Sequence, residues 1–157
     1  MGWFSNPKQS ESSNDLIVNA LNKSLAVIEF EPSGRIITAN SNFLNAMGYR
    51  LEEVQGQHHS MFVEPDEAQS SEYKNFWQRL RGGEFISNEF KRLANGGREV
   101  WIQATYNPII DSQGQVLKVI KFATDITEQK KQAAEAQGQL EAISKSQAVI
   151  EFNLDGT

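Results

Sequence analysis

The sequence of 157 residues contains no cysteine. Disulfides, thiolate metal sites and a thiol nucleophile are therefore excluded, and nothing in the composition indicates an oxidising compartment. Apolar runs stay well below the roughly 18 residues of a membrane span. The first residues also lack the basic and then apolar order of a secretory signal. We expect a cytoplasmic protein with no membrane partner.

An excess of basic residues is missing as well. The chain has 15 Lys and Arg against 20 Asp and Glu, a formal net charge of −5. The basic residues are scattered rather than gathered in a stripe, which argues against nucleic acid as a partner. The remaining composition, 39% hydrophobic and 22% charged, is typical of a globular domain that buries its own core.

One pentapeptide, AVIEF, occurs twice, at residues 26–30 and 148–152. The match extends over 20–35 and 142–157, where nine of sixteen positions are identical at a constant offset of 122. An offset of this size is longer than the roughly 20–50 residues of a solenoid repeat and is typical of whole domains. We therefore expect one complete domain and the first strand of a truncated second one. The alternative is that the last strand adds to the first domain's sheet.

The order of predicted elements is a helix, two strands, several short helices and a three-stranded meander. This order predicts an α+β fold with a five-stranded antiparallel sheet and short helices on one face. An N-terminal helix and a C-terminal linker helix flank it. The expected boundaries are a tail and helix at 1–22, the domain at 23–127, the linker helix at 128–146 and the first strand of a second domain at 147–157.

The expected linker helix carries residues at the seven-residue spacing of a coiled coil. Ile126, Ala133, Leu140 and Gln147 are seven residues apart, which predicts a weak coiled coil because Ala and Gln dominate the seam. We expect a homodimer that forms through the domain and its linker helices, with a solvated linker as the alternative.

Four segments resemble a PAS sensor domain over residues 23–127: ITANSNFLNAMGYRLEEVQGQ, FWQRLRGGEF, GGREVWIQATYNPIIDSQGQV and ATDITEQ. Residues 56–85 are especially similar to aerotaxis receptors and to soluble chemoreceptors with tandem PAS units. The resemblance implies a sensor rather than an enzyme. It implies a pocket between sheet and short helices, and a signal that leaves through the helix after residue 127. Its expected partners are a second PAS domain and a downstream signalling domain. The alternative is a cofactor-free interaction module of a histidine kinase or a cyclic-dinucleotide signalling protein.

The aerotaxis-type resemblance implies FAD as the cofactor. Trp77 aligns with an aromatic residue expected at the flavin, although it could equally be a core residue. Arg92 stands where the flavin-binding members have an asparagine, and could contact a pyrophosphate. Asn42, His59 and Asp66 complete the candidate cofactor residues. Against this assignment, Val63 and Glu64 replace an Arg-His pair of the flavin-binding members.

Haem b is the second candidate cofactor, and no cofactor is the third. His58 and His59 would be the axial ligands of a haem, the alternative being surface or hydrogen-bonding histidines. A metal-hydrolase reading of these histidines with Glu64 and Asp66 matches no helix-based motif. The sequence also has no nucleophile triad, phosphate loop or nucleotide fingerprint, so we do not expect an enzyme.

Overall fold

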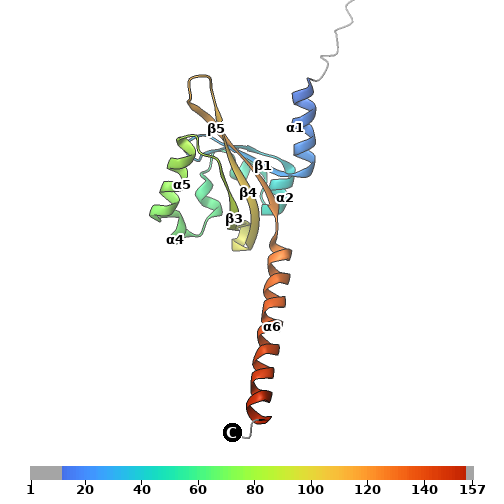
Figure 1. Cartoon of the computed structure of the whole chain (residues 1–157). Coiled ribbons are helices and arrows are strands. Elements are labelled where there is room, and N and C mark those ends of the chain that lie inside the picture. The colour runs from blue at the N-terminus through green and yellow to red at the C-terminus, as the bar shows by residue number, and fades with distance from the viewer. Residues whose placement is uncertain (1–11, 155–157) are drawn as a thin grey trace, which may run out of the picture.

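A five-stranded antiparallel sheet forms the centre of the computed structural model, which describes residues 12–154 and side chains up to residue 147 (Figure 1). The strand order is β2-β1-β5-β4-β3. The predicted fold class is therefore confirmed. The strands are β1 (Ala26–Phe30), β2 (Ile36–Ala39), β3 (Ile86–Leu93), β4 (Glu99–Ile110) and β5 (Val116–Asp125).

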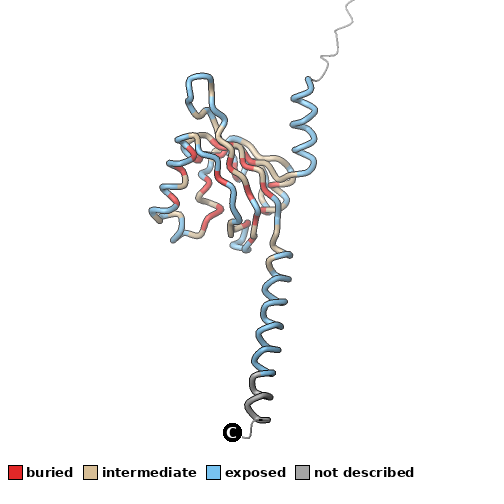
Figure 2. Tube along the Cα trace, in the orientation of Figure 1, coloured by how far each residue is buried: buried red, intermediate tan, exposed pale blue. Residues whose placement is uncertain are grey.

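Short helices lie between β2 and β3 in sequence and cover the inner face of the sheet. They are α2 (Ser41–Met47), α3 (Leu51–Val54), the 3-10 turn η1 (His59–Phe62), α4 (Pro65–Ala68) and α5 (Ser71–Arg81). A second 3-10 turn, η2 (Asn95–Gly97), joins β3 to β4. In Figure 2 the buried positions lie in the sheet, in these helices and in a few of the turns that join them, which places the core between the two layers.

Local sequence signals position the covering helices. Asn40 caps α2 by accepting a hydrogen bond from the Phe43 N–H, and Gly48 ends it with a φ of 72°. The positive φ is the left-handed conformation that favours glycine at a helix C-terminus. Ser70 caps α5 in the same way, and this helix buries Tyr73, Trp77 and Leu80 on one side, at helical spacing.

The N-terminal helix α1 (Ser13–Ser24) begins with a capping box formed by Ser12 and Asp15. It packs little of its surface on the domain, and none of its residues is buried. Its apolar side chains Leu16, Ile17 and Val18 are more than half exposed. Figure 2 shows the whole helix in the exposed colour.

The C-terminal helix α6 (Thr127–Leu154) projects away from the sheet (Figure 1). It runs through the second copy of the pentapeptide as far as Leu154, where the sequence predicts a strand. The second domain to which that strand would belong stays a prediction. A strand satisfies its backbone groups only by pairing with a neighbour. The continued helix satisfies them locally. Residues 155–157 of that prediction, and 1–11 of the expected tail, lie outside the described residues.

Candidate functional site

Three polar side chains are joined in the interior between sheet and helices. His59 Nδ1 lies 2.7 Å from the Tyr73 hydroxyl, and His59 Nε2 lies 3.0 Å from the Tyr106 hydroxyl. His59 and Tyr106 are fully buried and Tyr73 is 7% exposed. We refer to these three residues as the His59 cluster. Both imidazole nitrogens are occupied by hydroxyl groups, so the cluster satisfies itself.

Backbone geometry fixes His59 in this position. Its neighbour His58 caps η1, with Nδ1 accepting a hydrogen bond from the Ser60 N–H, while Nε2 lies 2.9 Å from the Ser33 carbonyl oxygen. The His59 N–H donates to the Gly34 carbonyl at 2.9 Å. The turn after β1 therefore holds both histidines, one pointing outward and the other inward.

The imidazole of His59 is held in its neutral form. Burial lowers the pKa of His59 well below its usual value, and the Arg92 and Lys121 cations lower it further. A neutral imidazole donates from one nitrogen and accepts at the other. Burial raises the pKa of Tyr73, which keeps its hydroxyl protonated. One tyrosine hydroxyl therefore donates to the imidazole and the other accepts from it, and the tautomer of His59 sets which does which.

Two cations are buried beside the cluster. Arg92 on β3 is 2% exposed and Lys121 on β5 is 1% exposed. Lys121 faces Tyr106 across the β4–β5 ladder, with Nζ 5.0 Å from the ring centroid. Within the described side chains Lys121 forms no ion pair. The interior thus carries a positive charge that no equally buried carboxylate balances.

This arrangement changes the proton affinity of both groups in the cross-strand pair. Burial lowers the pKa of Lys121, an effect that Tyr106 opposes. Burial by itself would raise the pKa of Tyr106. The Lys121 and Arg92 cations outweigh it, however, and the pKa of Tyr106 lies below its usual value. The two buried cations therefore favour loss of the Tyr106 proton, whereas burial opposes it.

Arg92 makes an incomplete set of contacts. Its Nη1 donates to Glu67 Oε1 at 3.4 Å and to the Lys91 carbonyl at 3.2 Å. Its guanidinium carbon lies 4.6 Å from the centroid of the Phe90 ring. Its Nε is buried and has no hydrogen-bond partner among the described residues. The partner carboxylate of Glu67 is 46% exposed, so this ion pair reaches from the interior to the surface.

Trp77 lies in the core, next to the His59 cluster. It is 3% exposed and makes edge-on contacts with Phe30, His59 and Phe76, at ring-centroid distances of 5.6, 5.3 and 5.8 Å. Its indole Nε1 has no partner among the described residues. Trp77, Arg92 and His59 are the three predicted residues that the structure brings together around one interior.

Asn42 and Asp66, the other two predicted cofactor residues, lie elsewhere. Asn42 donates to the carbonyls of Asn22, Lys23 and Leu25 and thereby holds the end of α1. Asp66 is exposed in the first turn of α4. Neither side chain faces the His59 cluster.

The histidines do not fit a haem. An axial ligand needs a free nitrogen lone pair. Both nitrogens of His59 contact tyrosine hydroxyls. In His58, Nδ1 accepts from the Ser60 N–H and Nε2 contacts the Ser33 carbonyl oxygen. The described residues also contain no group of three or more His, Asp or Glu side chains placed to hold a metal ion.

Trp77 and Arg92 are residue types suited to FAD, but the cavities beside them are too small for that cofactor. Two cavities flank α5: one of about 270 Å³ beside His58 and Trp77, and one of about 220 Å³ beside Tyr73 and Arg92. Both are smaller than the roughly 300–1,000 Å³ of sites for drug-sized ligands. Rings also fill the positions around Trp77 where an isoalloxazine would stack. Each cavity suits a smaller molecule.

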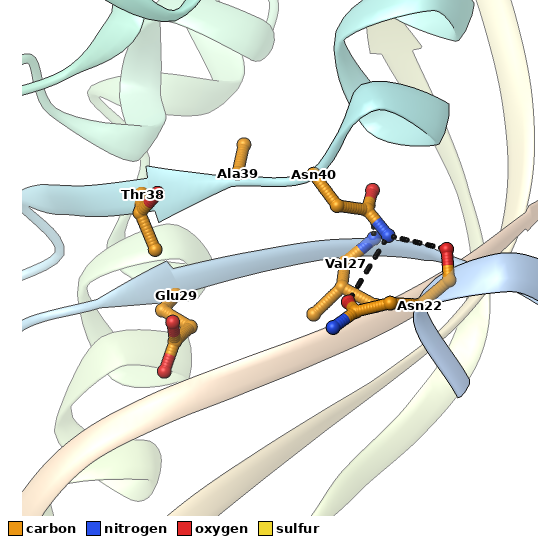
Figure 3. Close-up of a pocket in the computed structure, with 6 residues that line it drawn as sticks. All are labelled: Asn22, Val27, Glu29, Thr38, Ala39 and Asn40. Atoms are coloured by element: carbon orange, nitrogen blue, oxygen red, sulfur yellow. Dashed lines mark hydrogen bonds between the residues drawn. The ribbon is translucent and has the colours of Figure 1, made fainter. Parts of the chain in front are cut away.

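A third cavity, of about 190 Å³, lies at the outer edge of the sheet (Figure 3). Asn40 donates from Nδ2 to the Asn22 carbonyl and side-chain oxygens at 3.3 Å. Its Oδ1 accepts from the Val27 N–H at 3.0 Å. These bonds tie α1 to the β1–β2 edge, so this cavity belongs to the helix junction.

The family profile described as "PAS fold" matches residues 36–123. The chain belongs to the PAS family. The biofilm dispersion protein BdlA of Pseudomonas aeruginosa is 48% identical over 137 residues, which are 87% of this chain and 33% of that protein. The aerotaxis receptor of Escherichia coli is 30% identical over 64% of this chain and 19% of that receptor. The PAS chain therefore spans about a third or less of these relatives.

A solved PAS domain from Colwellia psychrerythraea has the same fold. It superposes with a TM-score of 0.66 over 74% of this chain and 99% of that domain, at 20% identity. Along the described part of this PAS chain, no helix combines the length and apolarity needed to cross a bilayer.

The PAS sheet also holds the start of α6. The Trp101 N–H of β4 donates to Thr127 Oγ1 at 3.0 Å, and the Ile126 N–H donates to the Trp101 carbonyl at 2.8 Å. Lys130 pairs with Glu89 of β3 and lies 5.0 Å from the centroid of the Trp101 ring. The strands that carry Arg92 and Tyr106 on the inner face therefore hold the first turn of α6.

Three functional candidates were missed from the sequence: Tyr73, Tyr106 and Lys121. Lys121 was detectable, because it interrupts the alternating buried positions Val119 and Ala123 of β5. A charged residue at an inward position of a strand requires an explanation. The tyrosines carried no comparable signal, since aromatic residues are ordinary in strands and on buried helix faces.

Proposed function

We propose that this PAS domain is the sensory unit of a cytoplasmic, non-enzymatic, chemoreceptor-like signalling protein. It detects a small molecule beside α5 and signals through α6. One observation carries the proposal: a buried polar cluster with two cations lies on the inner face of strands β3–β5, of which β3 and β4 hold α6. A domain that served only to fold would gain nothing from burying these charges.

Signalling needs two states with different ligand contacts. A molecule that engages Arg92 or Tyr73 changes the packing of β3 and α5 against β4. The first turn of α6 responds, because Trp101, Glu89 and Lys130 join it to the same strands. The helix then changes its orientation or its pairing with a partner helix.

The wider organisation is also part of the proposal. The 48% identical biofilm dispersion protein and the aerotaxis receptor are both longer than this chain, which supports a sensory unit followed by further signalling domains. The repeat at 142–157 supports a second PAS domain as the next one. Exposed apolar residues on α1 and α6 support a homodimer, and those on α1 also favour the alternative of an interaction module.

FAD is the cofactor that the sequence resemblance favours, and it requires the rings around Trp77 to open. An absorption spectrum of the purified protein, before and after addition of FAD or haemin, tests this. Flavin bands that bleach with dithionite would support FAD. A sharp Soret band would support haem. A spectrum without either favours a colourless ligand.

The sensory role itself is tested without knowing the ligand. Tyr73→Phe removes one hydroxyl from the His59 cluster and leaves the sheet intact. We expect faster amide hydrogen exchange in the first two turns of α6, measured by mass spectrometry. Tyr49 packs edge-on against Phe62 and is not part of the His59 cluster, so Tyr49→Phe is the control and should leave α6 unchanged. Identical α6 exchange in Tyr73→Phe and wild type would contradict coupling between interior and helix.

A further inference from the structure

The cavity of about 220 Å³ between α5 and β3 is lined at one end by a buried cation. Arg92 lines it although this side chain is almost fully buried, and Tyr73, Phe76, Phe90 and Ile86 contribute aromatic and apolar walls. Glu67, Glu72, Arg79 and Asn88 complete the lining. A buried cation at one end and an apolar body are the features of a site for a small amphipathic anion.

The contacts of Arg92 show which group the cation recognises. Both of its hydrogen bonds within the described residues use Nη1, whereas Nε is buried without a partner. A guanidinium presents parallel N–H donors that match the two oxygens of a carboxylate. Glu67 supplies one oxygen, at the long distance of 3.4 Å and from a half-exposed side chain. It acts as an imperfect internal carboxylate ligand.

The charge of the interior gives independent support. Lys121 and Arg92 are both buried near Tyr106, and the single carboxylate in contact with either within the described side chains is that of Glu67. Unbalanced buried charge is costly, and an anion placed among the cations lowers that cost. A deeper, better desolvated carboxylate would balance the charge more completely than Glu67 does.

We propose that the cavity beside α5 and β3 binds a small monocarboxylate with an apolar or aromatic body, whose carboxylate replaces Glu67 on Arg92. The volume suits a molecule of benzoate size. Glu67 and Glu72 at the cavity disfavour a second carboxylate on the ligand. This ligand class rests on the proposed sensory function and gives it a specific chemistry.

Binding has a structural consequence for α4. This helix is tied to β3 through Glu67 on Arg92, and Glu64 just before it pairs with Lys91 at 3.6 Å. Release of Glu67 removes one of the two ties, while Lys91 also pairs with Glu99 of β4. When a ligand carboxylate replaces Glu67 on Arg92, α4 keeps only the Glu64–Lys91 ion pair to β3 and is held less firmly.

Calorimetric titration of the 157-residue chain tests the proposal with three probes: benzoate, phenylacetate and 3-methylbutanoate. Each is compared with its neutral amide, and inorganic phosphate is the alternative anion. We expect at least one carboxylate to bind, with its amide at least tenfold weaker and phosphate not bound. Equal binding of acid and amide, binding of phosphate alone, or no binding of any carboxylate would overturn the proposal.

Two glutamate variants give the sharpest comparison. Glu67→Gln removes the competing carboxylate, so carboxylate affinity should rise several-fold. Glu72→Gln lines the same cavity but does not contact Arg92, and should change affinity less than twofold. Equal effects of the two variants would contradict the displacement of Glu67. Arg92→Gln should reduce binding at least tenfold. If that variant does not fold, the comparison of Glu67→Gln with Glu72→Gln tests the proposal by itself.

The same titration separates the ligand proposal from the sensory function. Hydrogen exchange of α6 is measured with each carboxylate. Binding without a change in α6 supports the carboxylate site and contradicts signalling through that helix. An α6 response to Tyr73→Phe together with no carboxylate binding leaves the sensory function standing and overturns the ligand class.

Discussion

Tyr106 and Lys121 stand directly opposite each other on β4 and β5, with the Lys121 Nζ 5.0 Å from the Tyr106 ring centroid. This pair places a cation where the alternation of the strand calls for an apolar residue. Burying the Lys121 cation lowers the free energy of unfolding, so an apolar replacement should stabilise the domain.

Lys121→Met should raise the free energy of unfolding by about 1–3 kcal/mol, because an apolar side chain of similar length replaces a desolvated cation. In the wild type, the lowered pKa of Lys121 means that the unfolded chain binds more protons below its ordinary pKa. Stability should therefore rise with pH up to about 10.5, and less so in the variant. Urea unfolding at several pH values measures both effects. Lys118→Met, at a partly exposed position, should not stabilise.

His59→Gln tests the neutral imidazole. The pKa of His59 is lowered by burial first and by Arg92 second, so the unfolded chain takes up a proton near pH 6.5 that the folded chain does not. The free energy of unfolding of the wild type should therefore fall on acidification below about pH 6.5, by up to about 1.4 kcal/mol per pH unit for this one proton. Gln can keep both tyrosine contacts without titrating. The slope should decrease in His59→Gln and persist in the exposed control His58→Gln.

Gly34→Ala should be more destabilising than an alanine at another turn glycine. Gly34 has a φ of +93°, and an added Cβ would lie 2.5 Å from His58 Nε2 and 3.1 Å from Trp77. Gly96 has a similar φ of +81° with nothing within 4 Å. Gly96→Ala should cost about 1–2 kcal/mol from the backbone alone, and Gly34→Ala about 1–3 kcal/mol more from overpacking. Equal losses in thermal unfolding would contradict the close approach of the turn to the histidine.

Thr127→Val should loosen the connection between sheet and helix. The Trp101 N–H loses its acceptor, which costs about 1–3 kcal/mol when the donor stays desolvated. Hydrogen exchange at the start of α6 should accelerate while exchange in β1 and β2 stays at the wild-type rate. Thr124→Val, at an exposed position of β5, is the matched control and should stay within about 0.5 kcal/mol of wild type.

Ile17→Asp should weaken self-association. Leu16, Ile17, Val18 and Leu21 of α1 are exposed in the single chain, and an apolar helix surface of this kind is stabilised when a partner covers it. Sedimentation velocity should show dissociation at concentrations at least tenfold higher than for the wild type. Asn19→Asp adds the same charge to the opposite side of α1 and should dimerise normally. A monomeric wild type would contradict the proposed homodimer.

Local signals determined much of this fold. Ser12, Asn40 and Ser70 are of the residue types that favour helix N-caps, and they cap α1, α2 and α5, while Gly48 ends α2. These interactions act over a few residues, so they can be read without knowing the rest of the structure. The strand alternation and the turns of the meander likewise specify the order of the sheet. The fold class and the positions of most elements follow from these features.

Tertiary context decided the remainder. The second AVIEF has the same five residues as β1, yet it is helical in α6 while the first copy pairs with β2 and β5. Its conformation depends on partner strands, which no local pattern supplies. Asn42 and Asp66 were predicted from a resemblance, but packing turns Asn42 to α1 and leaves Asp66 in solvent.

The candidate site shows the same division. Through its resemblance to PAS domains, the sequence singled out His59, Trp77 and Arg92. It could not show that His59 binds Tyr73 fourteen residues away and Tyr106 forty-seven residues away. Nor could it show that Arg92 is 2% exposed while its partner Glu67 is half exposed. Chain composition and short-range pattern fixed which elements form. Only the folding of distant segments against one another decided which polar groups are buried together, because burial is a property of the whole packed core.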